Sequence, residues 1–373
     1  MGDAMQRWWA LARRVCTVAW ACAGAACGDA APYRIGIVLG SEGALAATLA
    51  ADSLNAARGA HDRRVELRIL PHAYGTSAEI ALEGADSLAL DGSVVAVVGH
   101  SNSSASLAAS QIYNARHVVQ IAPTTTSPQY SQAGPYSYRL VASDAHQARF
   151  LVDQVGTPAG RIAVVYVNDD YGRSLRQLVD EALTARGITP AYQVPYAESE
   201  KDGTDVVNAL VNARPATLLW LGRDDLFARI ADSLRARLPH LAVLATDGFG
   251  SVSVQRNIFP QLAGVRYVRL VNVDGVAPAL RALDARYRRA GGQALTDQAI
   301  LTYDAVMLLG TAVREAGTDR EAIRQWLDAL GRARPAYVGV SGPISFSPDG
   351  DRSPSYVLVT AGAPPSVPAT PRQ

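Results

Sequence analysis

Short apolar runs alternate with longer helix-like stretches over most of the chain, in two successive series. The apolar runs predict strands at 33–39, 65–69, 94–98 and 118–121 in the first series, and at 162–167, 188–194, 217–221 and 241–245 in the second. The predicted helices are 42–58, 77–90, 104–115, 171–186, 205–213 and 225–238. Repeated strand–helix–strand order builds parallel sheets that are covered on both faces. The chain is therefore predicted to be α/β, with two doubly wound parallel-sheet lobes.

The N-terminal stretch has the pattern of a secretory signal: arginines, then a short apolar run at 15–23, then small residues before Cys27. The run is too short to remain as a membrane-spanning helix. We consider two interpretations of its end. The stretch resembles a bacterial lipobox, which would make Cys27 the lipidated first residue of an exported protein, although Gly24 departs from the usual aliphatic residue. Alternatively, an ordinary signal is cleaved after Ala26.

Charge and cysteine content limit which binding partners, metals and cofactors can be expected. The chain has 35 basic and 34 acidic residues, a formal net charge of +1, and no long basic run, so nucleic acid is not an expected partner. The body after Cys27 has no cysteine, and the six histidines of the chain are scattered, so we expect no metal site and no cofactor. No later apolar run reaches spanning length, which leaves the N-terminal lipid as the expected membrane attachment.

Ligands of open parallel sheets bind outside the carboxyl ends of the strands. After the strand 94–98 comes the turn Gly99–Ser104, in which Ser103 and Ser104 stand at the start of a helix. Hydroxyls and backbone amides at a helix N-terminus can hold an anion such as a carboxylate. The turn can also be read as an ordinary helix cap, but a cap needs one polar residue and this turn has four.

A second candidate loop is Ala122–Pro128, which includes Thr124 and Thr126 between two prolines. The prolines stiffen the loop, so docking a ligand costs little entropy. The position after a strand favours ligand binding over a generic loop.

Two further candidates belong to the second series. Asp247 follows the predicted strand 241–245, and its carboxylate can pair with a ligand ammonium or simply cap a surface turn. Tyr171 begins a predicted helix, and its ring can stack on a ligand or face solvent in a turn.

Motifs of catalysis are absent from the sequence. It has no G-x-G-x-x-G after the first strand, no phosphate-binding G-x-x-x-x-G-K-[ST] and no G-x-S-x-G elbow. The sequence indicates no nucleophile that would pair with His100 as a general base. We therefore expect no enzymatic activity.

Taken together, the motifs resemble the class I periplasmic solute-binding proteins of the branched-chain amino acid ABC transporter type, the Leu/Ile/Val-binding protein family. The resemblance runs from about Tyr33 to Val359. It is carried by Leu54–Gly59 (I-N-A-A-G-G in the family), Val98-Gly99-His100 with its serines, Ala122–Pro128 (S-P-A-A-T-S-P), Asp169–Gly172 (D-x-x-Y-G), Tyr303-Asp304-Ala305, and Gly342–Phe346 with Gly350-Asp351.

The resemblance implies the periplasmic binding protein-like I fold, in which three segments, near Val141, Val271 and Phe346, form a hinge. It places 32–141 and 272–346 in lobe 1 and 142–271 and 347–362 in lobe 2, with a disordered tail at 363–373.

The resemblance also implies roles for the candidate residues. Ser103 would bind the ligand carboxylate with its hydroxyl and amide, and Ser104 belongs to the same turn. Thr126 would contact carboxylate and amine, and the Thr124 carbonyl would accept from the amine. Tyr171 would flank the side-chain pocket, and Asp247 would receive the ammonium. The family's second-lobe aromatic is not found, since Arg223 and Asp224 stand after the strand 217–221. The side-chain pocket is therefore expected to be more polar.

The sequence thus predicts an exported solute-binding protein that captures a small amino-acid-like ligand by lobe closure and delivers it to an ABC transporter permease. In an alternative hypothesis, a protein of the same fold acts as a ligand sensor or envelope regulator without a transport role. Permease and ATPase genes adjacent to its own gene would favour transport over this alternative. A third hypothesis, an exported hydrolase, requires a base near a nucleophile.

Overall fold

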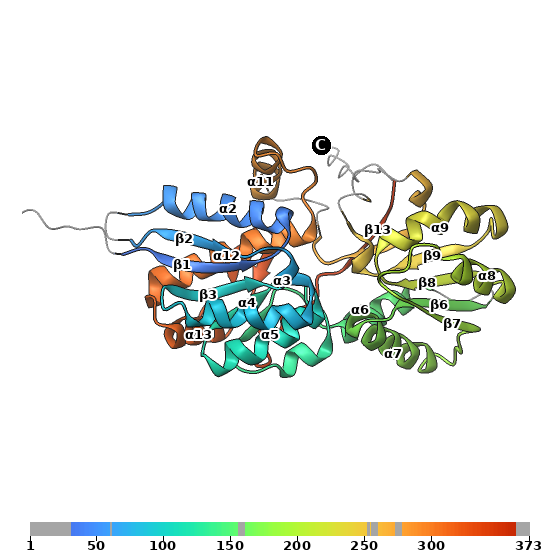
Figure 1. The fold of residues 1–373 in the computed structure, drawn as a ribbon, viewed down its shortest axis with the longest axis horizontal. Coiled ribbons are helices and arrows are strands. Elements are labelled where there is room, and N and C mark those ends of the chain that lie inside the picture. Colours follow the sequence, from blue (N-terminus) through green and yellow to red (C-terminus); the bar gives the residue numbers. More distant parts are fainter. Residues whose placement is uncertain are drawn as a thin grey trace, which may run out of the picture.

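The computed structural model describes residues 31–59, 62–155, 161–251, 254, 260–272 and 278–362. These residues form two α/β lobes side by side along the long axis of the molecule (Figure 1). The predicted fold class is confirmed. The expected signal segment with Cys27 and the expected tail at 363–373 lie outside the described residues.

Lobe 1 is built on a five-stranded parallel sheet of order β2-β1-β3-β4-β5. Its strands are β1 (Tyr33–Val38), β2 (Val65–Ile69), β3 (Val94–Gly99), β4 (Val119–Ala122) and β5 (Ser137–Arg139). In the register of the sheet, Tyr33 lies beside Val65, and Ala96 beside Val119. Every residue of β3 is buried, as its run of valines predicts for a central strand covered on both faces.

Helices cover both faces of this sheet. One core contains residues of α2 (Ser41–Ala56), α11 (Pro278–Arg289), α12 (Asp297–Ala316) and α13 (Arg320–Asp328). Small residues of α2, such as Ala46 and Ala50, let α12 approach closely. The opposite face is covered by α4 (Ala78–Leu90) and α5 (Ser103–Ala115), with the short α3 (Ala73–Thr76) beside them.

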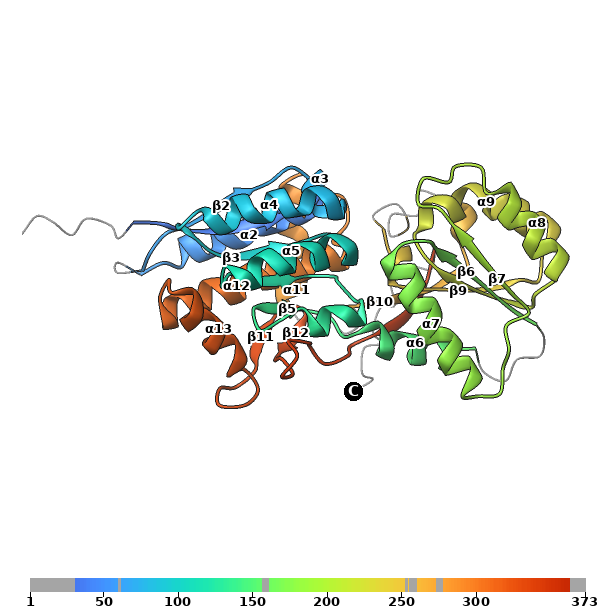
Figure 2. The same ribbon diagram turned by 60° about the horizontal axis from the view of Figure 1, so that its bottom comes forward.

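Lobe 2 is built on a six-stranded sheet of order β13-β10-β9-β8-β6-β7. Its strands are β6 (Ile162–Val167), β7 (Tyr192–Tyr196), β8 (Thr217–Leu221), β9 (Ala242–Ala245), β10 (Arg266–Arg269) and β13 (Val357–Thr360). Only β13 runs antiparallel to its neighbour. The helices α6 (Asp144–Asp153) and α7 (Asp170–Thr184) lie on one side, and α8 (Thr204–Ala213) and α9 (Asp224–Arg237) on the other (Figures 1 and 2).

Two local expectations differ from the structure. The strand expected at 188–194 is β7 at Tyr192–Tyr196. The reason is that Ile188 still belongs to the end of α7: its N–H donates to Leu183 O at 3.0 Å, after Gly187 has turned the chain with a φ of +70°. The helix α6 and the strand β5 were not predicted.

The chain crosses between the lobes near Val141 and Val271, and again after Arg352. The segment 347–352, expected in lobe 2, contacts lobe 1. Its Asp351 accepts hydrogen bonds from the Arg139 guanidinium, with both Nε–Oδ1 and Nη2–Oδ2 at 2.6 Å. Arg352 donates to Ser341 O at 2.8 Å. The third crossing thus lies a few residues later in the chain than Phe346.

The remaining short elements are the hairpin of β11 (Tyr337–Gly339) and β12 (Gly342–Ile344) and three 3₁₀ turns, η1 (Pro128–Gln132), η2 (Asp247–Phe249) and η3 (Pro260–Leu262).

Candidate functional site

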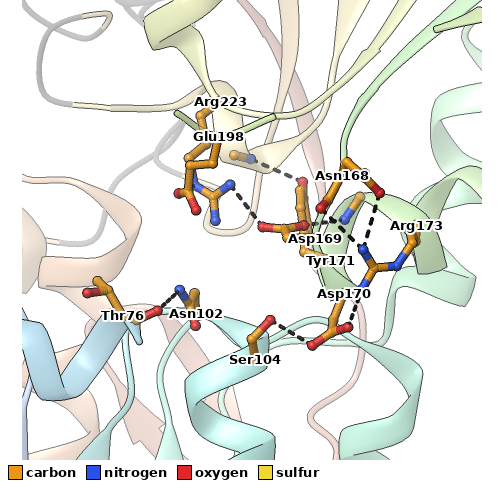
Figure 3. Close-up of polar contacts among 12 residues, drawn as sticks. Thr76, Asn102, Ser104, Asn168, Asp169, Asp170, Tyr171, Arg173, Glu198 and Arg223 are labelled. Atoms are coloured by element: carbon orange, nitrogen blue, oxygen red, sulfur yellow. Dashed lines mark hydrogen bonds and ion pairs between the residues drawn. The ribbon is translucent and has the colours of Figure 1, made fainter. Parts of the chain in front are cut away.

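The loops at the carboxyl ends of the two sheets meet between the lobes. Ser104 at the start of α5 donates a hydrogen bond to Asp170 at the start of α7, with 2.8 Å between Oγ and Oδ2 (Figure 3). This contact joins the turn after β3 in lobe 1 to the turn after β6 in lobe 2. The predicted site residues lie in these turns and in the loops after β4 and β9.

Ser103 occupies the first turn of α5 and is buried. The helix is capped by Asn102, whose Oδ1 accepts from the Ala105 N–H at 2.9 Å. The backbone N–H groups of Ser103 and Ser104 therefore keep no acceptor within the described part of the chain. Free amides at a helix N-terminus, together with the Ser103 hydroxyl, suit an anionic group.

The loop after β4 lies directly beside Ser103. The Ser127 N–H donates to Ser103 Oγ at 3.4 Å, and Thr125 Oγ1 lies 2.7 Å from Ser106 Oγ on α5. Thr126 is 1% exposed, and its Oγ1 has no partner within hydrogen-bond geometry in the described residues, although it lies near enough to the Asp144 carboxyl to lower the pKa of that group. The Thr124 carbonyl likewise receives no hydrogen bond from them. Lobe 1 therefore presents a hydroxyl and a carbonyl with unused hydrogen-bonding capacity beside the amides of α5.

In lobe 2, Tyr171 and Asp247 are in direct contact. The Tyr171 hydroxyl donates to Asp247 Oδ1 at 2.8 Å. Tyr171 is placed by the tight start of α7, because a Cβ on the next residue, Gly172, would lie 1.9 Å from Val167 O at the end of β6. Asp247 Oδ2 carries no hydrogen bond from any described residue. One oxygen of this carboxylate is thus anchored, and the other is available to a ligand.

Two residues that the sequence analysis missed connect these groups. Gln147 on α6 donates through Nε2 to Asp247 Oδ1 at 2.8 Å and to Asp144 Oδ1 at 3.1 Å. The Asp144 N–H donates to Thr126 O at 2.8 Å. A local signal could have predicted the helix α6 that carries them. Serine is a favoured N-cap residue, and Ser143 caps α6 with its Oγ accepting from Ala145 N at 3.4 Å.

Burial is the main cause of the pKa shifts of the two carboxyl groups, Asp144 and Asp247. Asp144 is fully buried, and burial and the nearby Asp247 charge raise its pKa well above the usual value. Burial also raises the pKa of Asp247, whereas the hydrogen bonds from Gln147 and Tyr171 oppose that rise.

A charged cluster stands at the same edge of lobe 2. Arg223 Nη1 lies 3.1 Å from Asp169 Oδ2, and its Nε lies 3.3 Å from Glu198 Oε1. Asp169 is also the N-cap of α7, where its Oδ1 accepts from Gly172 N at 2.8 Å. Thr76 and Asn102 of lobe 1 lie across from this cluster (Figure 3). Arg223 thus belongs to an ion-paired cluster, and whether this cluster lines the expected polar side-chain pocket stays a prediction.

The structure brings the candidate residues into two groups, Ser103 with Thr126 and Tyr171 with Asp247. Their contact with a ligand remains a prediction. His100 is buried, with Nδ1 2.7 Å from Tyr74 O, and burial lowers its pKa to about 4. It is a neutral structural histidine. Across the described ranges, no cluster of three or more metal-ligating His, Cys, Asp or Glu residues occurs, and no helix is long and apolar enough to cross a membrane.

Comparison with known proteins places this geometry in context. A family model described as "Periplasmic binding protein" matches residues 32–362. The Leu/Ile/Val-binding protein of Escherichia coli is 24% identical over 336 residues, which cover 88% of this chain and 86% of that protein. Leu/Ile/Val-binding protein homolog 1 of Brucella melitensis is 27% identical over 293 residues, covering 74% and 73%.

Solved structures share the fold. The branched-chain amino acid transporter substrate-binding protein LivJ of Streptococcus pneumoniae, in complex with isoleucine, superposes with a TM-score of 0.78 at 19% identity and covers 88% of this chain and 96% of that one. A solute-binding protein of an ABC transporter from Rhodopseudomonas palustris, in complex with p-hydroxybenzoic acid, gives 0.76 at 13% identity and covers 88% and 92%.

Proposed function

Because the chain belongs to the periplasmic binding protein family, we propose that it captures a small amino-acid-like ligand between its lobes and delivers it to the permease of an ABC transporter. The solute-binding role follows from the family, whose matched members are binding proteins and not enzymes. The class of ligand, the permease and the details of the site are our proposal.

The observation that carries the ligand class is the complementary pair of half-sites. Lobe 1 offers free amides, the Ser103 hydroxyl and the Thr126 hydroxyl, which suit a carboxylate. Lobe 2 offers the free Oδ2 of Asp247, which suits an ammonium group. A zwitterion with both groups on one carbon can bridge the lobes. The matched relatives with Leu/Ile/Val-binding names agree with this class of ligand.

The mechanism follows from this division of groups. The ligand docks on Ser103 and Thr126. Lobe 2 then rotates and brings the side chains of Asp247 and Tyr171 into contact with the ligand. Ligand binding energy thus stabilises a closed form, which presents a distinct surface to a permease. We place the protein outside the cytoplasm, as its family is, and infer that Cys27 carries a lipid anchor.

A thermal-shift screen of the purified protein against the common L-amino acids, followed by calorimetry, tests this function. A ligand that binds only the native state raises the melting temperature, by an amount that grows with concentration over Kd. We expect at least one L-amino acid to raise it, and the same compound without its amine to have no effect. Equal shifts with and without the amine would contradict the proposal.

The charged cluster predicts a preference for ligands with polar side chains. An apolar side chain against Arg223 and Glu198 would remove water from their charges without replacing its hydrogen bonds. We expect L-glutamine to bind about tenfold more tightly than L-leucine of similar size, equivalent to about 1.4 kcal/mol. In Arg223→Leu the ratio should fall toward one, and in the control Arg237→Leu, on the exposed end of α9, it should stay unchanged. Calorimetry measures both ratios, and tighter leucine binding by the unaltered protein would refute this preference.

Binding should also depend on pH. The ammonium requires ionised Asp247, whose pKa burial holds above 3.8. Affinity should therefore be highest above that raised pKa and fall as the pH drops through it, by at most about tenfold per pH unit for one proton. Calorimetric titrations across this range measure the effect. An affinity that rises on acidification would show that Asp247 does not bind as an anion.

A further inference from the structure

Gln147 makes three hydrogen bonds to the two aspartates of the site. Its Nε2 donates to Asp247 Oδ1 at 2.8 Å and to Asp144 Oδ1 at 3.1 Å, and its Oε1 accepts from the Asp247 N–H at 3.0 Å. A primary amide has two N–H donors, so both donors of Gln147 are used on these two carboxyl groups. The side chain is fully buried.

The orientation of this amide is fixed by its neighbours. A flipped amide would turn Oε1 toward two carboxyl oxygens and Nε2 toward a backbone N–H, which would lose all three hydrogen bonds. Gln147 thus forms hydrogen bonds with both the backbone N–H and the side-chain carboxylate of Asp247. Together with the Tyr171 hydroxyl, it occupies Oδ1 and leaves Oδ2 as the oxygen without a hydrogen bond from described residues.

The same side chain extends a hydrogen-bonded path that begins in lobe 1. Asp144, its second acceptor, donates its backbone N–H to Thr126 O in the lobe 1 loop. Gln147 and Asp144 belong to the first turn of α6, directly after the first crossing of the chain. A continuous hydrogen-bonded path therefore leads from the Thr126 loop along the hinge to Asp247.

We propose that Gln147 is a positioning residue that orients Asp247 for the ligand and ties this orientation to the Thr126 loop across the hinge. The proposal deepens the proposed function, since it assumes that Asp247 receives the ligand ammonium. Two donors on Oδ1 also favour the ionised carboxylate against its burial and against the nearby charge of Asp297. Arg139 and the hydroxyls of Tyr171 and Tyr356 are the other ionisable groups around the pair.

A carboxyl titration by NMR tests the positioning role without any ligand. The full chain is labelled with ¹³C at the aspartate carboxyl groups, and the Asp247 signal is assigned by its loss in Asp247→Asn. In Gln147→Met, which keeps the size and removes both donors, we expect the Asp247 titration midpoint to rise by about half to one pH unit. Gln147→Glu, which also lacks the donors and adds a carboxyl group, should raise it further. The matched control is Gln177→Met on the exposed face of α7.

The outcomes separate the two proposals. A raised midpoint in both Gln147 variants and an unchanged one in the control support the positioning role. If Gln147→Met is too unstable to titrate, Gln147→Leu, which also removes both donors and adds no charge, takes its place. An unchanged Asp247 midpoint in the folded variants overturns the positioning role, whatever the protein binds. Failure of every amino acid to bind the unaltered protein would instead refute the proposed function.

Discussion

Replacement of Asp247 by asparagine should weaken amino acid binding about a hundredfold, equivalent to about 2.7 kcal/mol. The substitution keeps the size of the side chain and removes the negative charge that we assign to the ligand ammonium. Loss of one partner of a desolvated charge pair costs about 2–5 kcal/mol, because the other charge is left buried and unpaired. Calorimetry of the amino acid with the largest thermal shift measures the effect.

The control for this experiment is Asp232→Asn, which alters an exposed aspartate of α9 in the same lobe. Its affinity should match that of the unaltered protein. The pH dependence of binding in the acidic range should disappear in Asp247→Asn, because the titrating group is gone. An Asp247→Asn protein that is folded and binds with unaltered affinity would show that the ammonium lies elsewhere.

Replacement of Arg139 by leucine should lower the free energy of unfolding by about 3–5 kcal/mol. Arg139 is fully buried and binds both oxygens of Asp351, and its Nη1 donates to Ser127 O at 2.7 Å. Its removal leaves a largely buried carboxylate and a buried carbonyl without their donor. Urea denaturation, followed by fluorescence, measures the loss.

The control is Arg288→Leu. Arg288 pairs with Asp284 at 2.9 Å one helical turn away, and its side chain is 57% exposed. Solvent screens such a pair, so its loss should cost no more than about 0.5 kcal/mol. Similar losses in the two variants would mean that Arg139 does not secure the Thr126 loop and the third crossing as the contacts indicate.

The fold was largely predictable from sequence because its strands carry unusually clear patterns. The valine run of β3 favours a strand buried on both faces, and the alanines of α2 indicate a closely packed helix. The start of β7 was placed too early because Ile188 is apolar and yet belongs to the end of α7, where its N–H donates to Leu183 O. A hydrogen bond of that kind leaves little trace in a hydrophobic pattern.

The candidate site was predictable where residues follow strand ends. Ser103, Thr126, Tyr171 and Asp247 all lie at such positions, and the structure groups them in pairs. Gln147 was missed because α6 carries few apolar residues in its first turns and lies at no strand end. Its role depends on a partner exactly one hundred residues away in sequence, and a contact at that distance has no local signature.

A crystal structure of the complex with the amino acid that gives the largest thermal shift tests the central claim most directly. We expect closed lobes, the ligand carboxylate on the amides of Ser103 and Ser104 and the hydroxyls of Ser103 and Thr126, and the ammonium on Asp247 Oδ2. A ligand bound within one lobe only, or with its amine turned away from Asp247, would contradict it.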